Sequence, residues 1–275
     1  MKIYDYTYGV AQTEQDFVNY VDDFLTSTIG GWTRIDTISD TSSNRDFVWK
    51  STGESPDDYD DIYIRIRGQT YLYVYGYGVY EDSSTYWQEL YNATYSYINC
   101  GSTPFRYWMW GDKDFVAFTV LNSDGNTYTG YLGFIESAYI PETDSRPLLI
   151  KGHAASTYYW TTGGSNDTQL MHSPTSSGVE AYEGYQWSTL LSYDQGRRET
   201  KLLLMPVVLK CEIAGHEEVR GRPNGVYQIN DARAPKVAPI TSASGVFLAF
   251  RQGTSTTNTY AYGPVASGIE GFNMW

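Results

Sequence analysis

The first periodic pattern in the chain is a stripe of apolar residues at helical spacing near the N-terminus. Apolar side chains recur at i, i+3, i+4, i+7 and i+8, which places them on one face of a helix: Phe17, Tyr20, Val21, Phe24 and Leu25. Thr13 and Asp16 resemble a capping box, with Asp in place of the usual Glu. Gly30 and Gly31 are typical of a helix end. The pattern predicts one amphipathic helix that begins near Thr13 and ends at these glycines.

After this helix the pattern changes to a period of two, which is typical of β-strands with one buried face. A short strand is expected at 47–50, and in the next one Ile62, Ile64 and Ile66 alternate with more polar residues. A turn at Gly68-Gln69 is expected to lead into a strand from Tyr71 to Tyr80.

The strand from Tyr71 to Tyr80 carries a row of tyrosines. Its alternate positions are Tyr71, Tyr73, Tyr75 and Tyr77, and tyrosine makes up 27 of the 275 residues of the chain. A phenol has an apolar body and a hydrogen-bonding tip, so it suits a packed surface that stays partly wet. We therefore predict that these four rings form an interface with other proteins.

Further strands are predicted in the second half of the chain. Segments 115–121 and 127–135 flank the turn sequence Asn122-Ser123-Asp124-Gly125-Asn126, which predicts a β-hairpin. Segments 202–209 and 246–250 are apolar, and Pro206 indicates that the first of them is an edge strand or is bulged.

These elements predict a mainly β fold: an antiparallel β-sandwich-like domain with an N-terminal amphipathic helix and long aromatic-rich loops. We interpret residues 1–275 as a single domain with an extended loop insertion near 151–196. The insertion is rich in Gly, Ser and Thr, yet Tyr158, Tyr159 and Trp160 make it too aromatic for a flexible linker. We expect it to pack on a neighbouring segment or on another subunit.

Charge and cysteine content narrow the classes of partner. The chain has 19 basic and 32 acidic residues, and its net charge of -13 disfavours binding to nucleic-acid backbones and anionic lipids. The sequence contains no long apolar run typical of a membrane span and no secretory signal at MKIYDYTYGV. Cys100 and Cys211 are expected to be buried free thiols, with a long-range disulfide as the alternative.

No catalytic or metal-binding signature stands out. Asp57-Asp58-Tyr59-Asp60-Asp61 could gather oxygen ligands for calcium, but its spacing is not that of an EF-hand, and a solvated acidic loop explains it. The histidines, His153, His172 and His216, are expected in separate loops without a hydrolase motif. A glycosidase would need a pair of carboxylates, and nothing selects one among Asp112, Asp114, Glu136, Glu180 and Glu183. We therefore predict a protein without enzymatic activity, cofactor or metal.

The segment around Trp108 and Trp110, with Phe105 and Tyr107, is a second concentration of aromatic residues. These rings could stack on sugars, but aromatic residues are also favoured in cores and at protein–protein interfaces. We favour a core or interface role over glycan binding.

The order of motifs along the chain resembles a loose group of structural proteins found in the virions of tailed bacteriophages and in prophages. The resemblance spans nearly the whole chain and is most specific at 105–112 and at Gly225-Val226-Tyr227. The motifs that support it are GGW at 30–32, GSTPFRYWMWGD at 101–112, YLGFI at 131–135, RPLLIKG at 146–152, RGRPNGVY at 220–227 and VFLAF at 246–250. These are architectural motifs, so the resemblance implies no active-site residue.

The resemblance implies a non-enzymatic structural component of a tailed-phage virion, in the tail, baseplate or neck, that is assembled in the host cytoplasm. Its expected partners are other virion proteins and further copies of itself in a symmetric array. The predicted interface residues are Tyr71, Tyr73, Tyr75, Tyr77, Trp108, Trp110, Tyr158, Tyr159 and Trp160. The alternatives are a glycan- or receptor-binding module of the particle, a capsid decoration protein, and a polysaccharide-degrading enzyme.

Overall fold

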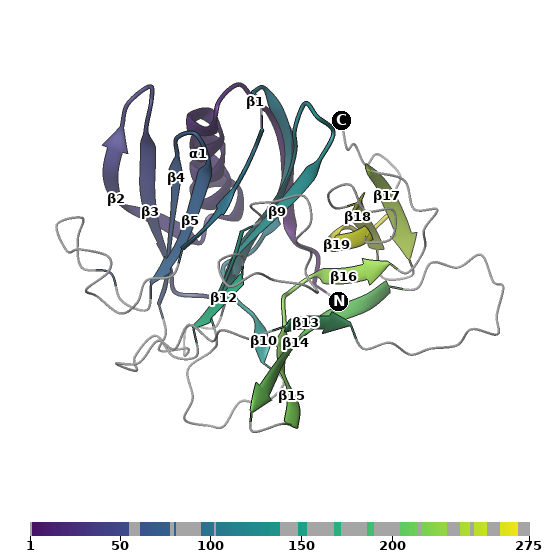
Figure 1. Cartoon of the computed structure of the whole chain (residues 1–275). Helices are drawn as coiled ribbons and strands as arrows, with labels where there is room; N and C mark the ends of the chain where they lie inside the picture. The colour runs from purple at the N-terminus through teal and green to yellow at the C-terminus, as the bar shows by residue number, and fades with distance from the viewer. Residues whose placement is uncertain are drawn as a thin grey trace.

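The structure is a computed structural model of the chain (Figure 1). It describes residues 2–54, 61–77, 80, 95–101, 103–137, 148–152, 168–171, 186–189, 204–213, 216–229, 237–242, 245–251 and 259–268. Within these ranges the fold is mainly β, its strand pairs are antiparallel, and its one helical segment lies near the N-terminus, as predicted.

The helical segment consists of α1 (Glu14–Asp23) and a final π-helical turn, η1 (Phe24–Ile29). The side chain of Thr13 caps α1 by accepting a hydrogen bond from the backbone N–H of Asp16 at 3.1 Å. Gly30 ends the segment with a φ of 68°, a left-handed conformation that glycine adopts without a steric penalty. The predicted boundaries are therefore confirmed. Of the predicted stripe only Tyr20 is exposed, and its ring stacks on Tyr107.

The described strands form three sheets. The central sheet has the order β1 (Asp5–Ala11), β7 (Phe105–Gly111), β8 (Phe115–Leu121), β9 (Thr127–Phe134), β11 (Leu148–Lys151) and β12 (Thr168–Met171). The tyrosine sheet has the order β2 (Trp32–Asp40), β3 (Arg45–Ser51), β4 (Ile62–Gly68), β5 (Leu72–Tyr77) and β6 (Tyr95–Ile98). The C-terminal sheet has the order β10 (Glu136–Ser137), β15 (His216–Arg222), β14 (Leu204–Ile213), β16 (Val226–Ile229), β19 (Thr259–Ala266), β18 (Gly245–Arg251) and β17 (Val237–Ser242), with β13 (Gln186–Thr189) paired to β14.

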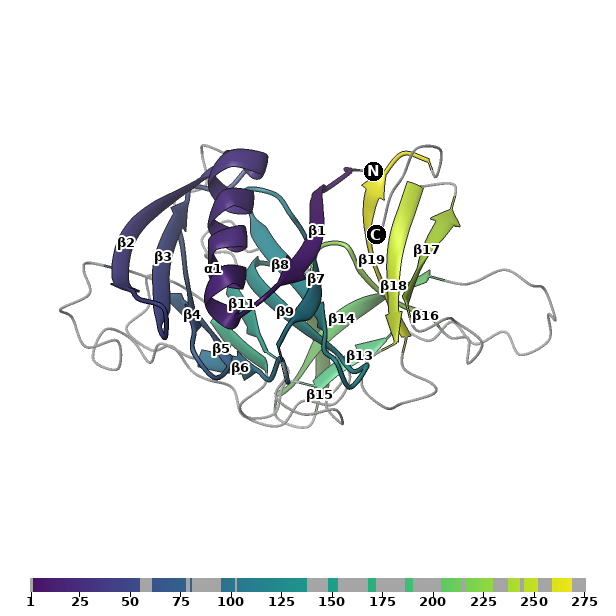
Figure 2. The same cartoon turned by 90° about the horizontal axis from the view of Figure 1, so that it is seen from above.

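The helix lies between the tyrosine sheet and the central sheet (Figure 2). One core cluster joins the three elements: Phe17, Val21 and Phe24 of the helix meet isoleucines of β4 and alternate residues of β7 and β8. Each fully buried ring or branched side chain contributes about 2 kcal/mol to stability, so this cluster determines how the helix sits.

The opposite face of the central sheet is also buried, because the C-terminal sheet packs on it. Trp108 packs against Phe250 with tilted rings whose centroids are 5.0 Å apart, and the ring centroids of Trp110 and Tyr262 are 4.5 Å apart. Every residue of β9 is buried. Burial on both faces explains why segment 115–121 is apolar at nearly every position instead of alternating.

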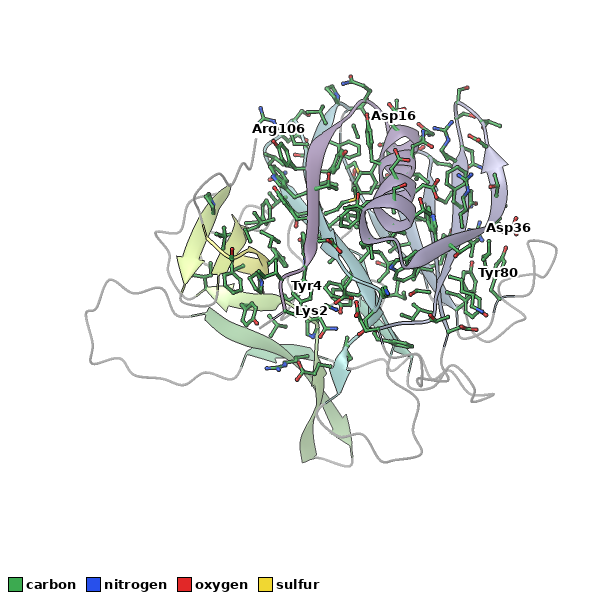
Figure 3. All side chains as sticks on the ribbon, turned by 180° about the vertical axis from the view of Figure 1, so that it is seen from behind. Lys2, Tyr4, Asp16, Asp36, Tyr80 and Arg106 are labelled. Carbon is green, nitrogen blue, oxygen red and sulfur yellow. The ribbon has the colours of Figure 1, made fainter. Side chains whose placement is uncertain are left out.

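The N-terminal residues contact two of the sheets at their junction (Figure 3). The backbone N–H of Tyr4 donates to the carbonyl of Pro264 at the end of β19, and the Tyr4 ring lies edge-on to Phe115 of β8. Lys2 forms ion pairs with Glu54 at 2.8 Å and with Asp112 at 2.9 Å. The first residues of the chain therefore join the central and C-terminal sheets.

The hairpin of segments 115–121 and 127–135 is present as β8 and β9, with a turn in which the Asn122 side chain accepts from the Asn126 N–H at 2.8 Å. The edge-strand alternative for segment 202–209 agrees with the pairing at Pro206: among the described strands, Leu204–Pro206 pair with β16 alone, and β14 has neighbours on both sides only from Leu209 on, where β13 and β15 both pair. The register shift of β14 falls at Leu209/Lys210, and Pro206 pairs only with Tyr227 of β16. The loop assignment of His216 is wrong, because this residue begins β15.

Candidate interaction surface

The outer face of the tyrosine sheet, which points away from the helix, is a lattice of tyrosines and charged residues. Cross-strand pairing places Arg65 beside Tyr75, Arg67 beside Tyr73, and Tyr63 beside Tyr77. The intervening isoleucines of β4, with Leu72 and Val74 of β5, point into the core. We call this lattice the tyrosine–arginine face; its residues are Asp46, Lys50, Tyr63, Arg65, Arg67, Tyr71, Tyr73, Tyr75, Tyr77, Tyr80 and Tyr97.

Three cations of this face lie over tyrosine rings. The Arg65 guanidinium is 4.6 Å from the Tyr75 ring centroid, the Arg67 guanidinium is 4.4 Å from that of Tyr73, and the Lys50 ammonium is 5.5 Å from that of Tyr63. Each such contact adds about 0.5–2 kcal/mol, depending on its exposure. The stacks keep both the rings and the cations in defined positions.

A buried ion pair occupies the centre of the face. The Arg65 guanidinium donates two hydrogen bonds to the Asp46 carboxylate, at 2.7 and 2.6 Å, and a third to the Tyr77 hydroxyl at 3.2 Å. Burial alone would lower the pKa of Arg65, but the hydrogen bonds to Asp46 and Tyr77 raise it above its ordinary value. This geometry satisfies both buried charges.

Burial also perturbs the tyrosines. It raises the pKa of Tyr75 to about 12, although the nearby Arg67 and Arg65 favour the phenolate. At the margin of the face, Tyr80 donates a hydrogen bond to the Asp36 carboxylate of β2 (Figure 3). Both hydroxyls are therefore neutral donors at physiological pH.

One accessible part of the face is a cluster of half-buried tyrosines on and beside β6: Tyr71, Tyr73 and Tyr97. The rings of Tyr71 and Tyr97 are 5.5 Å apart, and those of Tyr73 and Tyr97 are 6.3 Å apart. Tyr75 and Tyr77, in contrast, are only 4% and 3% exposed. Of the four tyrosines predicted from the sequence, two are thus open to a partner and two mainly support the lattice.

Trp108 and Trp110 lie elsewhere, in the core between the central and C-terminal sheets, with exposures of 1% and 0%. Of the roles considered from the sequence, only the core role matches this position, because the surrounding rings leave no face of either indole free. The other three predicted interface residues, Tyr158, Tyr159 and Trp160, fall outside the described residues.

The acidic residues considered for catalysis have structural contacts. Asp112 and Asp114 lie in the turn between β7 and β8 and not on a strand; the Asp112 carboxylate accepts hydrogen bonds from the N–H groups of Asp114 and Phe115. Burial raises the pKa of Asp112, and the ion pair with Lys2 opposes that shift. Glu136 forms a two-pronged ion pair with Arg222, both contacts at 2.6 Å. Glu180 and Glu183 are outside the described residues.

Three further findings concern metals, thiols and membrane-spanning helices. In the part of the chain that the structure describes, no three metal-ligating side chains come together. Cys100 is a buried free thiol, and its burial raises its pKa. None of the helical segments within the described ranges is both long and apolar enough to cross a bilayer.

Sequence reasoning missed the charged half of the face, namely Asp46, Arg65 and Arg67. The signal was present, because Tyr63, Arg65 and Arg67 alternate with isoleucines and so share one side of a single strand. A scan against models of known protein families finds no match for the chain, and a search of curated proteins also finds none. The surface must therefore be interpreted from its own geometry.

Proposed function

We propose that the chain is a non-enzymatic structural component of a tailed-bacteriophage virion, located in the tail, baseplate or neck. It acts through protein–protein interfaces with other virion proteins and with further copies of itself. Two arguments support this: the motif order along the chain, and a rigid tyrosine-rich face on one sheet. The stacked sheets, which we interpret as sandwich-like, supply the stiffness that a repeated building block needs.

The observation that carries the proposal is the half-buried cluster of Tyr71, Tyr73 and Tyr97. Tyrosine offers a large contact area and has only two side-chain torsions to freeze on binding. Here the rings are already restrained by each other and by Arg67. A partner that docks on them loses less conformational freedom than it would on a mobile surface.

Glycan or receptor binding is the alternative from a different class. From the sequence it depended on Trp108 or Trp110 lining an open groove, but both indoles are buried. A glycan array still tests it directly: specific binding that Tyr71→Ser and Tyr97→Ser abolish would favour this alternative over an assembly interface.

Localisation in purified particles tests the main proposal. We expect mass spectrometry to detect the chain in particles purified through a density gradient, and electron microscopy of antibody-labelled particles to place it in the tail, baseplate or neck. A protein found only free in the lysate would show that the proposal is wrong.

The tyrosine cluster has its own test. Tyr73→Ser is expected to reduce incorporation into particles while lowering the unfolding midpoint only slightly, since this ring is only half-buried and loses one cation–π contact. Tyr75→Ser is a poorer probe, because its buried ring supports the lattice. Tyr20→Ser, which removes an exposed tyrosine from α1, is the matched control and should incorporate normally.

A further inference from the structure

The polar cluster at the junction of the central and C-terminal sheets contains a lysine between two carboxylates. The Lys2 ammonium lies 2.8 Å from Glu54 Oε1 and 2.9 Å from Asp112 Oδ2. We call these three side chains the lysine triad. An amine that touches one carboxyl group as electrophile and a second one as proton carrier has the components needed to form an amide.

The Asp112 side chain is held with one oxygen between two backbone N–H groups. Its Oδ1 accepts hydrogen bonds from the N–H of Asp114 at 2.7 Å and from that of Phe115 at 3.2 Å, while its Oδ2 faces Lys2. Two N–H groups on one oxygen are the arrangement that stabilises the oxyanion of a tetrahedral intermediate in acyl transfer. The Asp112 side chain is only 7% exposed, so these donors act where little water competes with them.

Both reacting residues are positioned by contacts outside the triad. The Asp112 backbone N–H donates to the Phe115 carbonyl at 3.0 Å, and the Asp112 carbonyl accepts from Trp32 Nε1 at 2.9 Å. Two residues after Lys2, Tyr4 is tied by its backbone to β19 and lies edge-on to Phe115 (Figure 3). Well-oriented groups within one molecule reach effective molarities of about 10⁵–10⁸ M, which favours the amide over the separate amine and acid.

A second lysine–aspartate pair provides a comparison. Lys50 Nζ lies 2.7 Å from Asp61 Oδ2, and the same oxygen accepts a hydrogen bond from the Tyr63 hydroxyl at 3.1 Å. Within the described ranges, Lys50 touches no second carboxylate and no pair of backbone N–H groups holds Asp61. The proton carrier and the oxyanion donors are therefore particular to Lys2 and Asp112.

We propose that Lys2 and Asp112 condense to an intramolecular amide, with Glu54 as the proton carrier. The new bond joins Lys2 Nζ to Asp112 Cγ, and it closes a covalent loop between the segment before β1 and the turn between β7 and β8. It is a single reaction of the chain on itself and not the turnover of a substrate. The inference goes beyond the proposed function and does not depend on it, because the bond forms within one copy.

The reaction balances without any further reagent. A proton first passes from Lys2 Nζ to Asp112 Oδ2, which leaves a neutral amine beside a neutral carboxyl group. The Nζ lone pair then attacks Cγ, Oδ1 takes the negative charge between its two N–H donors, and Glu54 Oε1 accepts one proton from the attacking nitrogen. When the Cγ–Oδ1 double bond re-forms, the Cγ–Oδ2 bond breaks, and Oδ2 takes the proton from Glu54 and leaves as water.

Burial of Asp112 favours the first proton transfer. It raises the pKa of this carboxyl group and so stabilises the neutral form. Lys2 opposes the transfer: burial alone would lower its pKa, but its hydrogen bonds to Glu54 and Asp112 raise it above the ordinary value. Loss of the proton from Lys2 therefore limits the rate, and we expect the amide to form slowly after folding.

Intact-mass spectrometry of the purified full-length chain tests the bond. We expect the wild type to become lighter by the mass of one water molecule, in a fraction that grows over several days of incubation. Lys2→Arg keeps the charge and should fold, since Lys2 is 46% exposed, but it cannot form this amide and should keep its full mass. Glu54→Gln should slow the loss about 10²–10⁴-fold, because it removes the proton carrier. Lys50→Arg is the matched control and should lose water like the wild type.

Peptide mapping identifies the residues that are joined. Trypsin does not cleave after an acylated lysine, so the digest should contain a branched peptide that links Lys2 to Asp112. Succinimide formation, for instance at Asp124-Gly125, also releases water, but it gives no branched peptide and persists in Lys2→Arg.

Two results would overturn the inference. One is a wild type that keeps its full mass and an unbranched map after incubation, and the other is a water loss that Lys2→Arg retains in full. Particle localisation depends on neither measurement, so the amide can be absent while the proposed function stands.

Discussion

The face of the central sheet that meets the C-terminal sheet and the tyrosine–arginine face of the tyrosine sheet look alike in sequence but differ in structure. Both carry aromatic residues at every other position: Trp108 and Trp110 on the central sheet, and Tyr73 and Tyr75 on the tyrosine sheet. The C-terminal sheet covers this face of the central sheet around Trp108 and Trp110, whereas Val10 and Arg106 at its margin stay exposed. The tyrosine–arginine face consists of tyrosines interleaved with arginines, and part of it stays half-exposed.

The difference shows that aromatic alternation alone does not reveal whether a face is covered. The neighbouring strand is more informative. Opposite Trp108 and Trp110, β8 supplies Thr119 and Ala117, and the same side of β8 carries no charge. Opposite Tyr73 and Tyr75, β4 supplies Arg67 and Arg65. A face that carries charges on the adjacent strand must solvate or pair them, so it is rarely sealed by an apolar layer.

The largest effect is expected from removing a ring on the covered face. Trp110→Ala should lower the free energy of unfolding by about 4 kcal/mol, because it leaves a cavity beside Tyr262. Urea titration measures this loss. Trp110→Phe should cost much less, since the indole N–H has no hydrogen-bond partner among the described residues to lose. A near-neutral Trp110→Ala would contradict the assignment of this face to the core.

A slightly smaller loss is expected from breaking the ion pair on the open face. Asp46→Asn should lower the free energy of unfolding by about 3 kcal/mol, because the buried Arg65 keeps its charge without a counterion. Arg67→Gln should lower it by only about 1 kcal/mol, because it loses a cation–π contact with Tyr73 and no ion pair among the described residues. Equal losses for Asp46→Asn and Arg67→Gln in chemical denaturation would remove the distinction between the two arginines.

Hydrogen-bonded polar groups between the central and C-terminal sheets should contribute less to the free energy of unfolding than Trp110 or Asp46 does. The Tyr262 hydroxyl lies 3.2 Å from Thr129 Oγ1, and Thr129 Oγ1 lies 3.0 Å from Thr119 Oγ1. Tyr262→Phe is therefore expected to lower the free energy of unfolding by about 1 kcal/mol. If Tyr262→Phe instead raises the free energy of unfolding, the buried hydroxyl destabilises the core despite its hydrogen bond.

The smallest effect at neutral pH concerns Tyr75, and it becomes visible only in alkali. Burial raises its pKa from the ordinary 10.0 to about 12, so the folded state keeps a proton that the unfolded state loses. The resulting contribution to stability is fully present below pH 10 and is lost as the pH rises to about 12. We expect Tyr75→Phe to flatten the decline of the unfolding free energy across this window. An unchanged slope would show that Tyr75 titrates normally.

Much of the local structure was predictable because it depends on neighbouring residues. Thr13 and Gly30 mark the helix ends through contacts within one turn, and Asn122 closes its hairpin by a hydrogen bond to Asn126. The alternation of Ile62, Ile64 and Ile66 correctly predicted which side of β4 is buried. Each of these signals is contained in a few consecutive residues.

The candidate site was predicted only in part. The sequence pointed to the tyrosines of β5, but it could not separate the half-buried Tyr73 from the buried Tyr75, which lie on the same side of one strand. It also grouped them with Trp108 and Trp110, which belong to a different layer. Exposure depends on which sheet covers which face, and that pairing joins residues more than a hundred positions apart, such as Trp110 and Tyr262.

The sequence by itself determined the strand-rich character of the chain, the single N-terminal helix and the inward side of the strands, because periodicity and capping are local. Only the tertiary structure decided that the tryptophans are core, that Asp46 neutralises Arg65, and that Arg67 forms no ion pair with another described residue. The reason is physical: burial and charge pairing depend on through-space neighbours, and these are fixed only when the sheets stack.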